Sequence, residues 1–368
     1  MGTSGHLSND VLFAVKYLSQ WFPIGKLKGI GRKLGGSYNI NIKVETSQGE
    51  FVVRILNRSN TEEHLHYIQK VFATLSEYGV PVLNPILTSS GDPFINYKDK
   101  LLQVTPFVKA DAFQCRHNQV RASARTLSVF HQSLQNTRPG PEPDWSFYRS
   151  RHYFVNTIDL LKNIEGIPKH ELKKVEKLAE HILETWEESQ DDLPTGIIHG
   201  DWHFWNQLYK SDEVYCVMDF DFIQQGKRVH DIAYALWAIY ILLPDYAKTF
   251  DEIFIKGYAN LTEEELKILP IAIAKVSLFF LCQAAYSSTP AEKWRKQYRR
   301  QMPLMEWLLA DGERRMFEAV HGKKEAPILD PELDPELDPE SESEESDPDS
   351  NIVANPESDS QSEWTELE

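Results

Sequence analysis

The hydrophobic periodicity of the chain changes near residue 108, and this change constrains the fold more than any other feature. Before it, the segment 38–44 alternates apolar and polar side chains, and a second strand-like segment over 51–56 follows a short turn. After it, apolar residues recur three or four positions apart over long stretches, as on one face of an amphipathic helix. The sequence therefore predicts a small β-rich unit followed by a larger helical one.

Further elements are predicted on both sides of this change. A helix over 61–78 ends at Gly79, with Pro81 just beyond it, and an apolar strand runs over 101–108. In the helical part, the predicted helices contain the segments 120–134, 172–186, 231–243 and 271–286. A short β hairpin interrupts them, with strands predicted at 195–199 and 214–219.

The last segment of the chain is strongly acidic. Residues 330–368 carry 16 acidic side chains and no Lys or Arg, and the tetrapeptide Leu-Asp-Pro-Glu occurs three times in succession from Leu329. Such a composition cannot bury enough apolar surface to offset the entropy lost on ordering, so residues 323–368 are predicted to form a disordered acidic tail. Residues 330–368 carry the whole formal charge of −16, because residues 1–329 have 39 acidic and 39 basic residues.

Residues 1–329 have no net charge, whereas nucleic-acid-binding proteins usually carry a basic surface that neutralises phosphates. The sequence therefore gives no indication of nucleic-acid binding. Three widely spaced cysteines (Cys115, Cys216 and Cys282) indicate neither a disulfide framework nor a zinc site. The apolar run 232–243 is short of the roughly 18 residues of a membrane span, and the N-terminus lacks a signal-peptide or myristoylation pattern. We therefore expect a soluble cytoplasmic protein without nucleic-acid or membrane partners.

Polar residues that look misplaced lie in and beside the predicted hairpin. His199-Gly-Asp201 follows directly on an apolar strand, Asn206 comes five residues later, and the second strand ends at Asp219-Phe-Asp221. Carboxylates beside apolar strands are costly to desolvate unless a charged or hydrogen-bonding group meets them. A turn or cap role explains any one of these residues alone, but the set together indicates a catalytic site.

The string His-Gly-Asp, Asn and Asp-Phe-Asp, followed by Asp231-Ile-Ala, resembles the aminoglycoside phosphotransferase and choline kinase superfamily. These are small-molecule kinases of protein-kinase-like fold, and the resemblance covers roughly residues 20–310. It implies an α+β, two-lobe architecture with a nucleotide-binding lobe at 1–108 and a helical catalytic and acceptor-binding lobe at 109–322. It also implies transfer of the γ-phosphate of ATP, or of GTP, to a hydroxyl of a metabolite or aminoglycoside-like acceptor.

The same resemblance implies a role for each residue of the motif. Asp201 is the base that orients and deprotonates the acceptor hydroxyl, and Asn206 and Asp219 bind Mg²⁺, a hard cation that prefers oxygen ligands. His199 holds the backbone of its loop. For Asp221, a supporting role at a second metal and a hydrogen-bonding structural role both remain open.

In the small lobe, two loose glycine-containing segments resemble the nucleotide loop of this superfamily. They are Lys28-Gly-Ile-Gly31 and the run Gly35, Gly36, Ser37, Tyr38 and Asn39. A glycine-rich loop brings backbone N–H groups close to phosphate oxygens, but without the hairpin motif it would be weak evidence.

Arg54 resembles the cation that this fold presents to the nucleotide phosphates. It stands where protein kinases have lysine, and a guanidinium binds phosphate bidentately; an ordinary surface arginine that extends to water is the alternative. An acidic partner is expected from the next helix. The candidates are Glu62 and Glu63, although both lie at the helix start while apolar residues occupy its inward face.

Several further residues have competing interpretations. Trp202 and Trp205 either line the acceptor pocket or pack in the core, and packing is favoured. Asp231 is interpreted as the N-cap of the buried helix that follows. His199, Asp201 and His203 alternate and resemble zinc ligands, so a metallohydrolase is one alternative function. A catalytically silent kinase-like protein that serves in binding or structure is the other.

Overall fold

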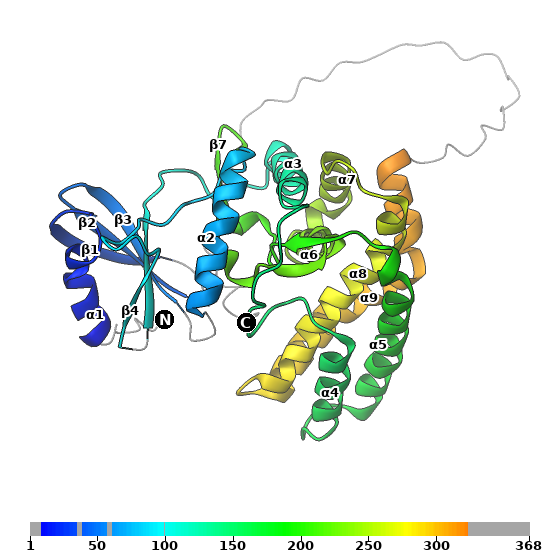
Figure 1. Ribbon diagram of the computed structural model, residues 1–368. Helices are drawn as coiled ribbons and strands as arrows, with labels where there is room; N and C mark the ends of the chain where they lie inside the picture. The colour runs from blue at the N-terminus through cyan, green and yellow to red at the C-terminus, as the bar shows by residue number, and fades with distance from the viewer. Residues whose placement is uncertain (1–8, 35–38, 57–60, 99, 323–368) are drawn as a thin grey trace, which may run out of the picture.

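The computed structural model describes residues 9–34, 39–56, 61–98 and 100–322. The predicted tail and the residues Gly35, Gly36 and Ser37 lie outside these ranges. A small antiparallel sheet lies at one end of the molecule and a group of helices at the other, with helix α2 (Glu62–Glu77) between them (Figure 1). The predicted α+β architecture, with a small sheet and a larger helical part, is confirmed.

The sheet has the strand order β1-β2-β3-β5-β4, and each strand is antiparallel to its neighbour. Its strands are β1 (Leu27–Leu34), β2 (Ile40–Thr46), β3 (Gly49–Ile55), β4 (Ile95–Tyr97) and β5 (Lys100–Pro106). The strands predicted over 38–44, 51–56 and 101–108 are confirmed to within a few residues. Lys28–Gly31, which we expected in the nucleotide loop, instead lies within β1 and pairs with β2.

One face of the sheet has an apolar core of its own. Helix α1 (Asn9–Lys16) and the 3-10 turn η1 (Leu18–Gln20) contribute Ala14, Val15 and Leu18 to this core. Alternate residues of the strands complete it, including Ile42, Val44, Val53, Ile55 and Val104. The strand alternation leaves Arg54 on the opposite face of β3.

Helix α2 packs in the core of the helical lobe and not in that of the sheet. Thr61 caps the helix by accepting a hydrogen bond from the His64 backbone N–H, and the chain leaves it at Gly79, which has a φ of 75°. The ring of Phe72 lies 4.6 Å, centroid to centroid, from that of Phe220, which belongs to the Asp219-Phe-Asp221 segment. Helix α2 therefore joins the sheet to the part of the chain that carries the predicted catalytic residues.

The helical lobe is built around the buried helix α6, whose residues from Val229 to Ile239 are all buried. Its helices are α3 (His117–Ser133), α4 (Arg151–Lys162), α5 (Lys169–Ser189), α6 (Val229–Leu242), α7 (Ala247–Gly257), α8 (Glu263–Cys282) and α9 (Pro290–His321). Short 3-10 turns are η2 (Gln190–Asp192), η3 (Phe204–Asn206), η4 (Phe220–Phe222), η5 (Pro244–Tyr246) and η6 (Gln283–Tyr286). Helix α8 packs against α5, α6 and α9.

The segment Glu263–Tyr286 is longer and more apolar than the sequence analysis recognised. By length and composition it qualifies as a membrane span, but 83% of its most apolar window is buried inside the fold. Helix α8 begins with a capping box, in which Thr262 and Glu265 bind each other's backbone N–H groups. These features are those of a core helix, as the sequence predicted for 271–286.

The β insertion has a different pairing from the predicted hairpin of 195–199 with 214–219, which was wrong. Strand β6 (Thr195–Ile198) pairs with β9 (Gln224–Lys227), and β7 (Gln207–Lys210) pairs with β8 (Glu213–Val217). The turn between β7 and β8 is formed by Ser211 and Asp212, both with positive φ, as in tight hairpin turns. The two strands that were missed, β7 and β9, have four residues each and a mixed polarity that gives too weak an alternation to be recognised in the sequence.

Candidate active site

The loop between β6 and β7 carries most of the predicted catalytic motif, and the buried Asp231 holds its start. Asp231 Oδ2 accepts a hydrogen bond from the His199 backbone N–H at 2.8 Å, and Oδ1 accepts one from Gly200 at 2.9 Å. His131 Nε2 lies 3.0 Å from Oδ2 of the same carboxylate. Burial alone would raise the pKa of Asp231, but the hydrogen bond and charge of His131 lower it on balance.

Asp231 is therefore not the helix cap that the sequence suggested. Arg228 occupies the N-cap position of α6, and Asp231 lies inside the first turn with no solvent exposure. From there it satisfies two backbone N–H groups of another segment, which would otherwise be buried without partners. The residue fixes the position of the loop and not the start of its own helix.

Two further contacts define the backbone path of the loop. Gly200 has a φ of 83°, and a Cβ at this position would lie 2.5 Å from the carbonyl oxygen of Phe222. His199 Nε2 lies 3.0 Å from the carbonyl oxygen of Met218, and burial lowers the pKa of its ring. The His199 side chain thus contacts the backbone of another segment, at the residue that precedes Asp219, and not that of its own loop.

Asp201 and Asn206 contact each other directly. The Asn206 amide nitrogen donates to Asp201 Oδ2 at 2.8 Å and to the Asp201 carbonyl oxygen at 3.0 Å. Asp201 Oδ1 is buried and has no hydrogen-bond partner among the described residues, and His203 Nε2 lies 3.5 Å from it. The carboxylate is thereby fixed through one oxygen, while the other can accept a further hydrogen bond.

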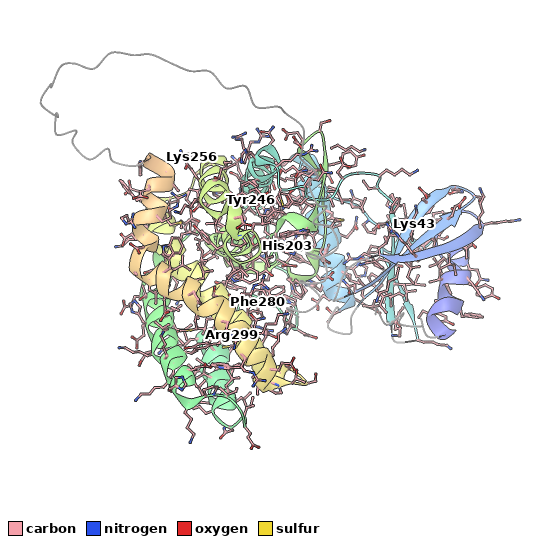
Figure 2. All side chains as sticks on the ribbon, turned by 180° about the vertical axis from the view of Figure 1, so that it is seen from behind. Lys43, His203, Tyr246, Lys256, Phe280 and Arg299 are labelled. Atoms are coloured by element: carbon pink, nitrogen blue, oxygen red, sulfur yellow. The ribbon has the colours of Figure 1, made fainter. Side chains whose placement is uncertain are left out.

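Figure 2 places this loop within the large lobe. His203 lies among the central elements of the helical lobe, on the side toward the sheet, whereas Lys43 marks the sheet itself. The Asn206 carbonyl oxygen accepts a hydrogen bond from the Met218 backbone N–H at 2.9 Å. The loop is therefore held next to the segment that carries Asp219.

Asp219 and Asp221 lie just beyond the end of strand β8. Asp219 adopts a left-handed backbone conformation, with φ 64° and ψ 60°, which costs about 1 kcal/mol in a non-glycine residue. This conformation turns the chain into η4, where Asp221 follows. The Asp219 side chain is 33% exposed, whereas that of Asp221 is 2% exposed. A solvated ion can therefore reach Asp219 much more easily than Asp221.

Arg54 crosses from the sheet to both carboxylates. Its Nη2 atom donates to Asp219 Oδ1 at 2.8 Å and lies 3.3 Å from Asp221 Oδ2. Burial alone would lower the pKa of Arg54, but the charges of Asp221 and Asp219 raise it on balance. The guanidinium belongs to the site and is not an ordinary surface arginine.

The expectation that Glu62 or Glu63 pairs with Arg54 was wrong. Both side chains are exposed in the first turn of α2, and Glu62 instead accepts a hydrogen bond from Asn96 at 3.1 Å. The acidic partners of Arg54 come from the segment after β8. In a single sequence, Glu62 and Glu63 stand close to Arg54, whereas this pairing spans more than 160 residues.

Two residues of the site were missed by the sequence analysis. The Asn39 amide nitrogen, just before β2, donates a short hydrogen bond to Asp221 Oδ2. His64, buried on α2, has Nε2 3.1 Å from the Asp221 carbonyl oxygen and Nδ1 3.1 Å from that of Pro141. Asn39 was considered only as part of a glycine-rich loop, and nothing in the local sequence distinguished His64 from the apolar face around it.

The tryptophans of the loop differ in their surroundings. Trp202 is 1% exposed, and its indole N–H donates to Ser123 Oγ at 3.1 Å, so it is a core residue. Trp205 is partly exposed and lies near the rings of Phe113 and His203. The favoured interpretation, packing, therefore holds for Trp202.

The zinc-site alternative has no support in the described ranges. No group of three His, Cys, Asp or Glu side chains there is arranged to hold a metal ion. Cys115, Cys216 and Cys282 are free, as predicted. Asp219 and Asn206 each carry a side-chain oxygen, and these two oxygens could serve as a smaller, oxygen-only donor set. This set fits Mg²⁺, which usually takes one or two protein ligands and completes its shell with water and phosphate.

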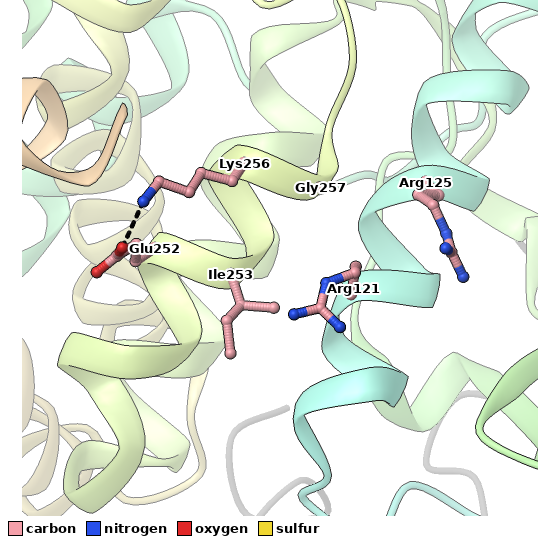
Figure 3. A pocket seen from close by; sticks show the side chains of 6 residues that line it. All are labelled: Arg121, Arg125, Glu252, Ile253, Lys256 and Gly257. Atoms are coloured by element: carbon pink, nitrogen blue, oxygen red, sulfur yellow. Dashed lines mark hydrogen bonds and ion pairs between the residues drawn. The ribbon is translucent and has the colours of Figure 1, made fainter. Parts of the chain in front are cut away.

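A cavity of about 370 Å³ lies elsewhere, between α3 and α7 (Figure 3). Its lining includes Arg121, Arg125, Lys256 and Glu252. The cations do not converge on a common point: Lys256 pairs with Glu252, and the Arg125 side chain points away from Arg121. We assign no ligand to this cavity.

A small antiparallel sheet, a helical lobe and a loop with Asp201 and Asn206 beside paired aspartates together define a kinase-like phosphotransferase. The sequence profile of the phosphotransferase enzyme family matches residues 31–268, and the chain belongs to this family. It is a small-molecule kinase, an enzyme that phosphorylates an alcohol group. The resemblance recognised in the sequence is confirmed, and the silent and metallohydrolase alternatives are set aside.

Individual relatives are distant. The chain is 25% identical over 279 residues to a homoserine kinase of Caulobacter sp. (strain K31), covering 72% of this chain and 82% of the relative. Among solved structures, a microcompartment-associated aminopropanol kinase aligns with a TM-score of 0.68 at 17% identity, covering 84% of this chain and all of that one. An amicoumacin kinase, solved with AMP-PNP and Ca²⁺, aligns with a TM-score of 0.63 at 16% identity, covering 80% and 93%. At these identities the structures support the fold alone.

Proposed function

We propose that this protein is a cytoplasmic, Mg²⁺-dependent kinase that transfers the γ-phosphate of ATP or GTP to the hydroxyl of a small amino alcohol. The observation that carries the proposal is the state of Asp201. One of its oxygens is fixed by the Asn206 amide, and the other is buried without a hydrogen-bond partner in the described part of the chain. A buried carboxylate oxygen in that state suits the hydroxyl proton of an acceptor.

Asp201 is the proposed base. Its Oδ1 atom accepts the hydrogen bond from the acceptor hydroxyl and orients the oxygen toward the γ-phosphate. It takes up the proton as the new P–O bond forms and the bond from the γ-phosphorus to the β–γ bridging oxygen breaks, which releases the nucleoside diphosphate. The Asp231 clamp on the backbone of residues 199 and 200 keeps this carboxylate in place. Little covalent work is asked of the protein, because phosphoryl transfer depends mainly on positioning and charge.

Asn206 and Asp219 are the proposed metal ligands. Because the Asn206 amide nitrogen is engaged by Asp201, its Oδ1 atom is the one left to bind a cation. A bound Mg²⁺ ion would neutralise charge on the phosphate oxygens. In its absence, the Arg54 guanidinium supplies the positive charge beside Asp219.

Nucleotide binding is assigned to the small lobe, proposed to span residues 1–108, with the acceptor in the helical lobe at 109–322. Arg54, which lies on strand β3 beside Asp219, is proposed to contact the phosphates. Gly35, Gly36 and Ser37 lie between β1 and β2, and their proposed role as the phosphate loop rests on the sequence. The segment 323–368 is proposed to be a solvated acidic tail.

The proposed acceptor class rests on the relatives. Homoserine and aminopropanol, the substrates named for two of them, share a hydroxyl and an amine on a short chain. An acceptor that also carries a carboxylate needs a cation in its pocket. Arg149 is the residue we assign to it: its guanidinium stacks near the rings of Trp145 and Tyr153, and Trp145 lies 5.2 Å from Phe222.

The first experiment is a thermal-shift titration with ATP and GTP, each with and without Mg²⁺, on the wild type and on Asp219→Ala. A ligand at about a hundred times its Kd stabilises the native state by roughly 2.7 kcal/mol, which is readily detected. We expect a Mg²⁺-dependent shift that the variant loses. No shift with either nucleotide would contradict the proposal.

An acceptor panel then follows, with homoserine, aminopropanol, ethanolamine, choline and an aminoglycoside. Phosphorylation of the short amino alcohols over the aminoglycoside is expected. If homoserine is the substrate, Arg149→Met should raise the KM for homoserine at least about tenfold and leave the KM for aminopropanol unchanged. The reason is that homoserine carries a carboxylate that Arg149 would bind, whereas aminopropanol has none. A preference for the aminoglycoside would refute the acceptor class without touching the phosphotransferase assignment.

A further inference from the structure

Asp221 is contacted from three separate elements of the N-terminal part of the chain. Its side-chain oxygen Oδ2 accepts the short hydrogen bond from Asn39, before β2, and lies 3.3 Å from Arg54 Nη2 on β3. Its backbone carbonyl oxygen lies 3.1 Å from His64 Nε2 on α2. Asp221 thereby connects the residue before β2, strand β3 and helix α2, the first two through its side chain and the third through its backbone.

We propose that Asp221 is a positioning residue: it is the acidic partner that fixes Arg54 for phosphate binding, in place of a residue of helix α2, and it leaves Asp219 to the metal. The inference rests on the proposed nucleotide site. It gives a role to Asp221, which the sequence left open. In this role Asp221 supports both the Arg54 guanidinium and Asn39, the residue before β2.

The two aspartates differ in the way that this division of roles requires. Asp221 is 2% exposed, and Oδ2 already receives the amide of Asn39 in addition to the guanidinium of Arg54. Asp219 is 33% exposed, so an ion can approach it from solvent. A buried carboxylate with hydrogen bonds in place is suited to hold a fixed charge, and a metal would have to displace those hydrogen bonds to bind it.

Helix α2 supports the same division. At the position along α2 that faces the site, the chain has His64, which contacts the backbone of Asp221, while Glu62 and Glu63 point to solvent. The helix therefore supplies no carboxylate to Arg54 and acts on it through Asp221. When phosphates bind, Arg54 has to give up its 2.8 Å contact with Asp219 while Asp221 still holds it.

This arrangement separates two measurable quantities. Loss of Asp221 should weaken nucleotide binding even without a metal, because Arg54 is no longer held where phosphates arrive. Loss of Asp219 should leave metal-free binding intact and abolish the gain in affinity that a metal gives. A residue that merely supports the fold would change neither quantity selectively.

The test measures ATP binding in EDTA and in Mg²⁺ for Asp221→Asn, Asp219→Asn, Arg54→Met and the double variant Arg54→Met/Asp221→Asn. Asp221→Asn and Arg54→Met should each weaken ATP binding in EDTA by about tenfold, and the double variant should be no worse than either, since the two residues act as one unit. Asp219→Asn should bind ATP in EDTA as the wild type does and lose the Mg²⁺-dependent increase.

Each contrary result has a distinct meaning. If Asp221→Asn keeps metal-free ATP binding and loses only the Mg²⁺ increase, Asp221 is a metal ligand and the proposal is overturned. Independent, additive losses in the double variant overturn it as well. Should Asp221→Asn fail to fold, Asn39→Ala, which removes one donor to the same carboxylate, must weaken metal-free binding for the proposal to stand. A wild type that binds no nucleotide refutes the proposed function instead.

Discussion

The two halves of the candidate site are held in different ways. The half with Asp201 and Asn206 lies entirely in the helical lobe, where the buried Asp231 and His131 fix its backbone. The half with Asp219 and Asp221 is completed only by residues from the sheet and from α2. The first half is organised by one lobe, whereas the second depends on how the two lobes meet.

This difference matters because the two halves have different tasks. The proposed base has to keep one orientation toward the acceptor, and a rigid loop serves that purpose. Arg54, the proposed phosphate-binding cation, and Asp219, the proposed metal ligand, would have to exchange partners when the nucleotide arrives. Contacts between lobes are better suited to that exchange, since relative movement of the lobes changes them without unfolding either core.

The strongest test of this contrast removes the support of the first half. Asp231→Ala should lower the free energy of unfolding by about 3–5 kcal/mol, because His131 and two backbone N–H groups lose a buried partner at once. Urea unfolding measures the change. Asp311→Ala is the matched control, since it removes an exposed pair with Arg314 and should cost less than about 1 kcal/mol. A loss as small as that of the control would show that the loop is not held by Asp231.

Low pH should destabilise the protein at the same half of the candidate site, the half that Asp231 supports. Burial lowers the pKa of His230, the neighbour of Asp231, to about 4, although the charge of Asp231 opposes this. The His230 ring is protonated below about pH 6.5 in the unfolded chain but only below about pH 4 in the folded protein. The stability that depends on the neutral ring is therefore fully present above pH 6.5. That contribution falls as the pH drops toward 4, by up to about 3 kcal/mol.

His230→Gln is the variant that tests this pH dependence, with the exposed His181→Gln as control. Unfolding free energies measured at pH 7 and at pH 5 should differ less in His230→Gln than in the wild type, and His181→Gln should behave as the wild type does. His199, whose pKa burial also lowers, retains part of the effect in all three proteins. An unchanged pH dependence in His230→Gln would contradict the assignment.

Asp201→Asn separates chemistry from binding. Turnover should fall by at least about a hundredfold, because an amide cannot take the proton from the acceptor hydroxyl. The affinity for Mg²⁺ and nucleotide should change little, since Arg54, Asp219 and Asp221 are untouched. Steady-state kinetics and a nucleotide titration on the same preparation measure both quantities. Normal turnover would show that Asp201 is not the base.

The contrast between the halves also explains what the sequence revealed. The loop residues Asp201 and Asn206 lie five positions apart, and residues so close in sequence meet whatever the rest of the fold does. Asp219 and Asp221 were found because they follow an apolar strand, but their partners Asn39 and Arg54 lie more than 160 residues away. Such pairs are set by the packing of the lobes, which no local pattern encodes.

The errors in secondary structure have the same physical basis. Strand β1 contains Gly29 and Gly31 and shows no regular alternation of burial, so its pairing with β2 has little local signature. Strand β9 pairs with β6, from which the β7–β8 hairpin separates it in the sequence, so its partner has no local signature. By contrast, α2, α6 and α8 were recognised because each is buried along a stripe or throughout its length.

The smallest effect is expected for substitutions of Glu62 and Glu63, which test whether helix α2 supplies a partner to Arg54. Glu62 is the residue that sequence proximity would pair with Arg54, yet its Oε1 atom accepts a hydrogen bond from Asn96, and both Glu62 and Glu63 are exposed. Glu62→Gln and Glu63→Gln should therefore leave metal-free ATP affinity within about twofold of the wild type, because an exposed charge at this distance is screened by water and salt. Loss of affinity comparable to that of Arg54→Met would mean that α2 supplies the partner after all, through a movement of the helix when nucleotide binds. Unchanged affinity leaves the carboxylates beyond β8 as the partners of Arg54, which makes the second half of the site a contact between lobes.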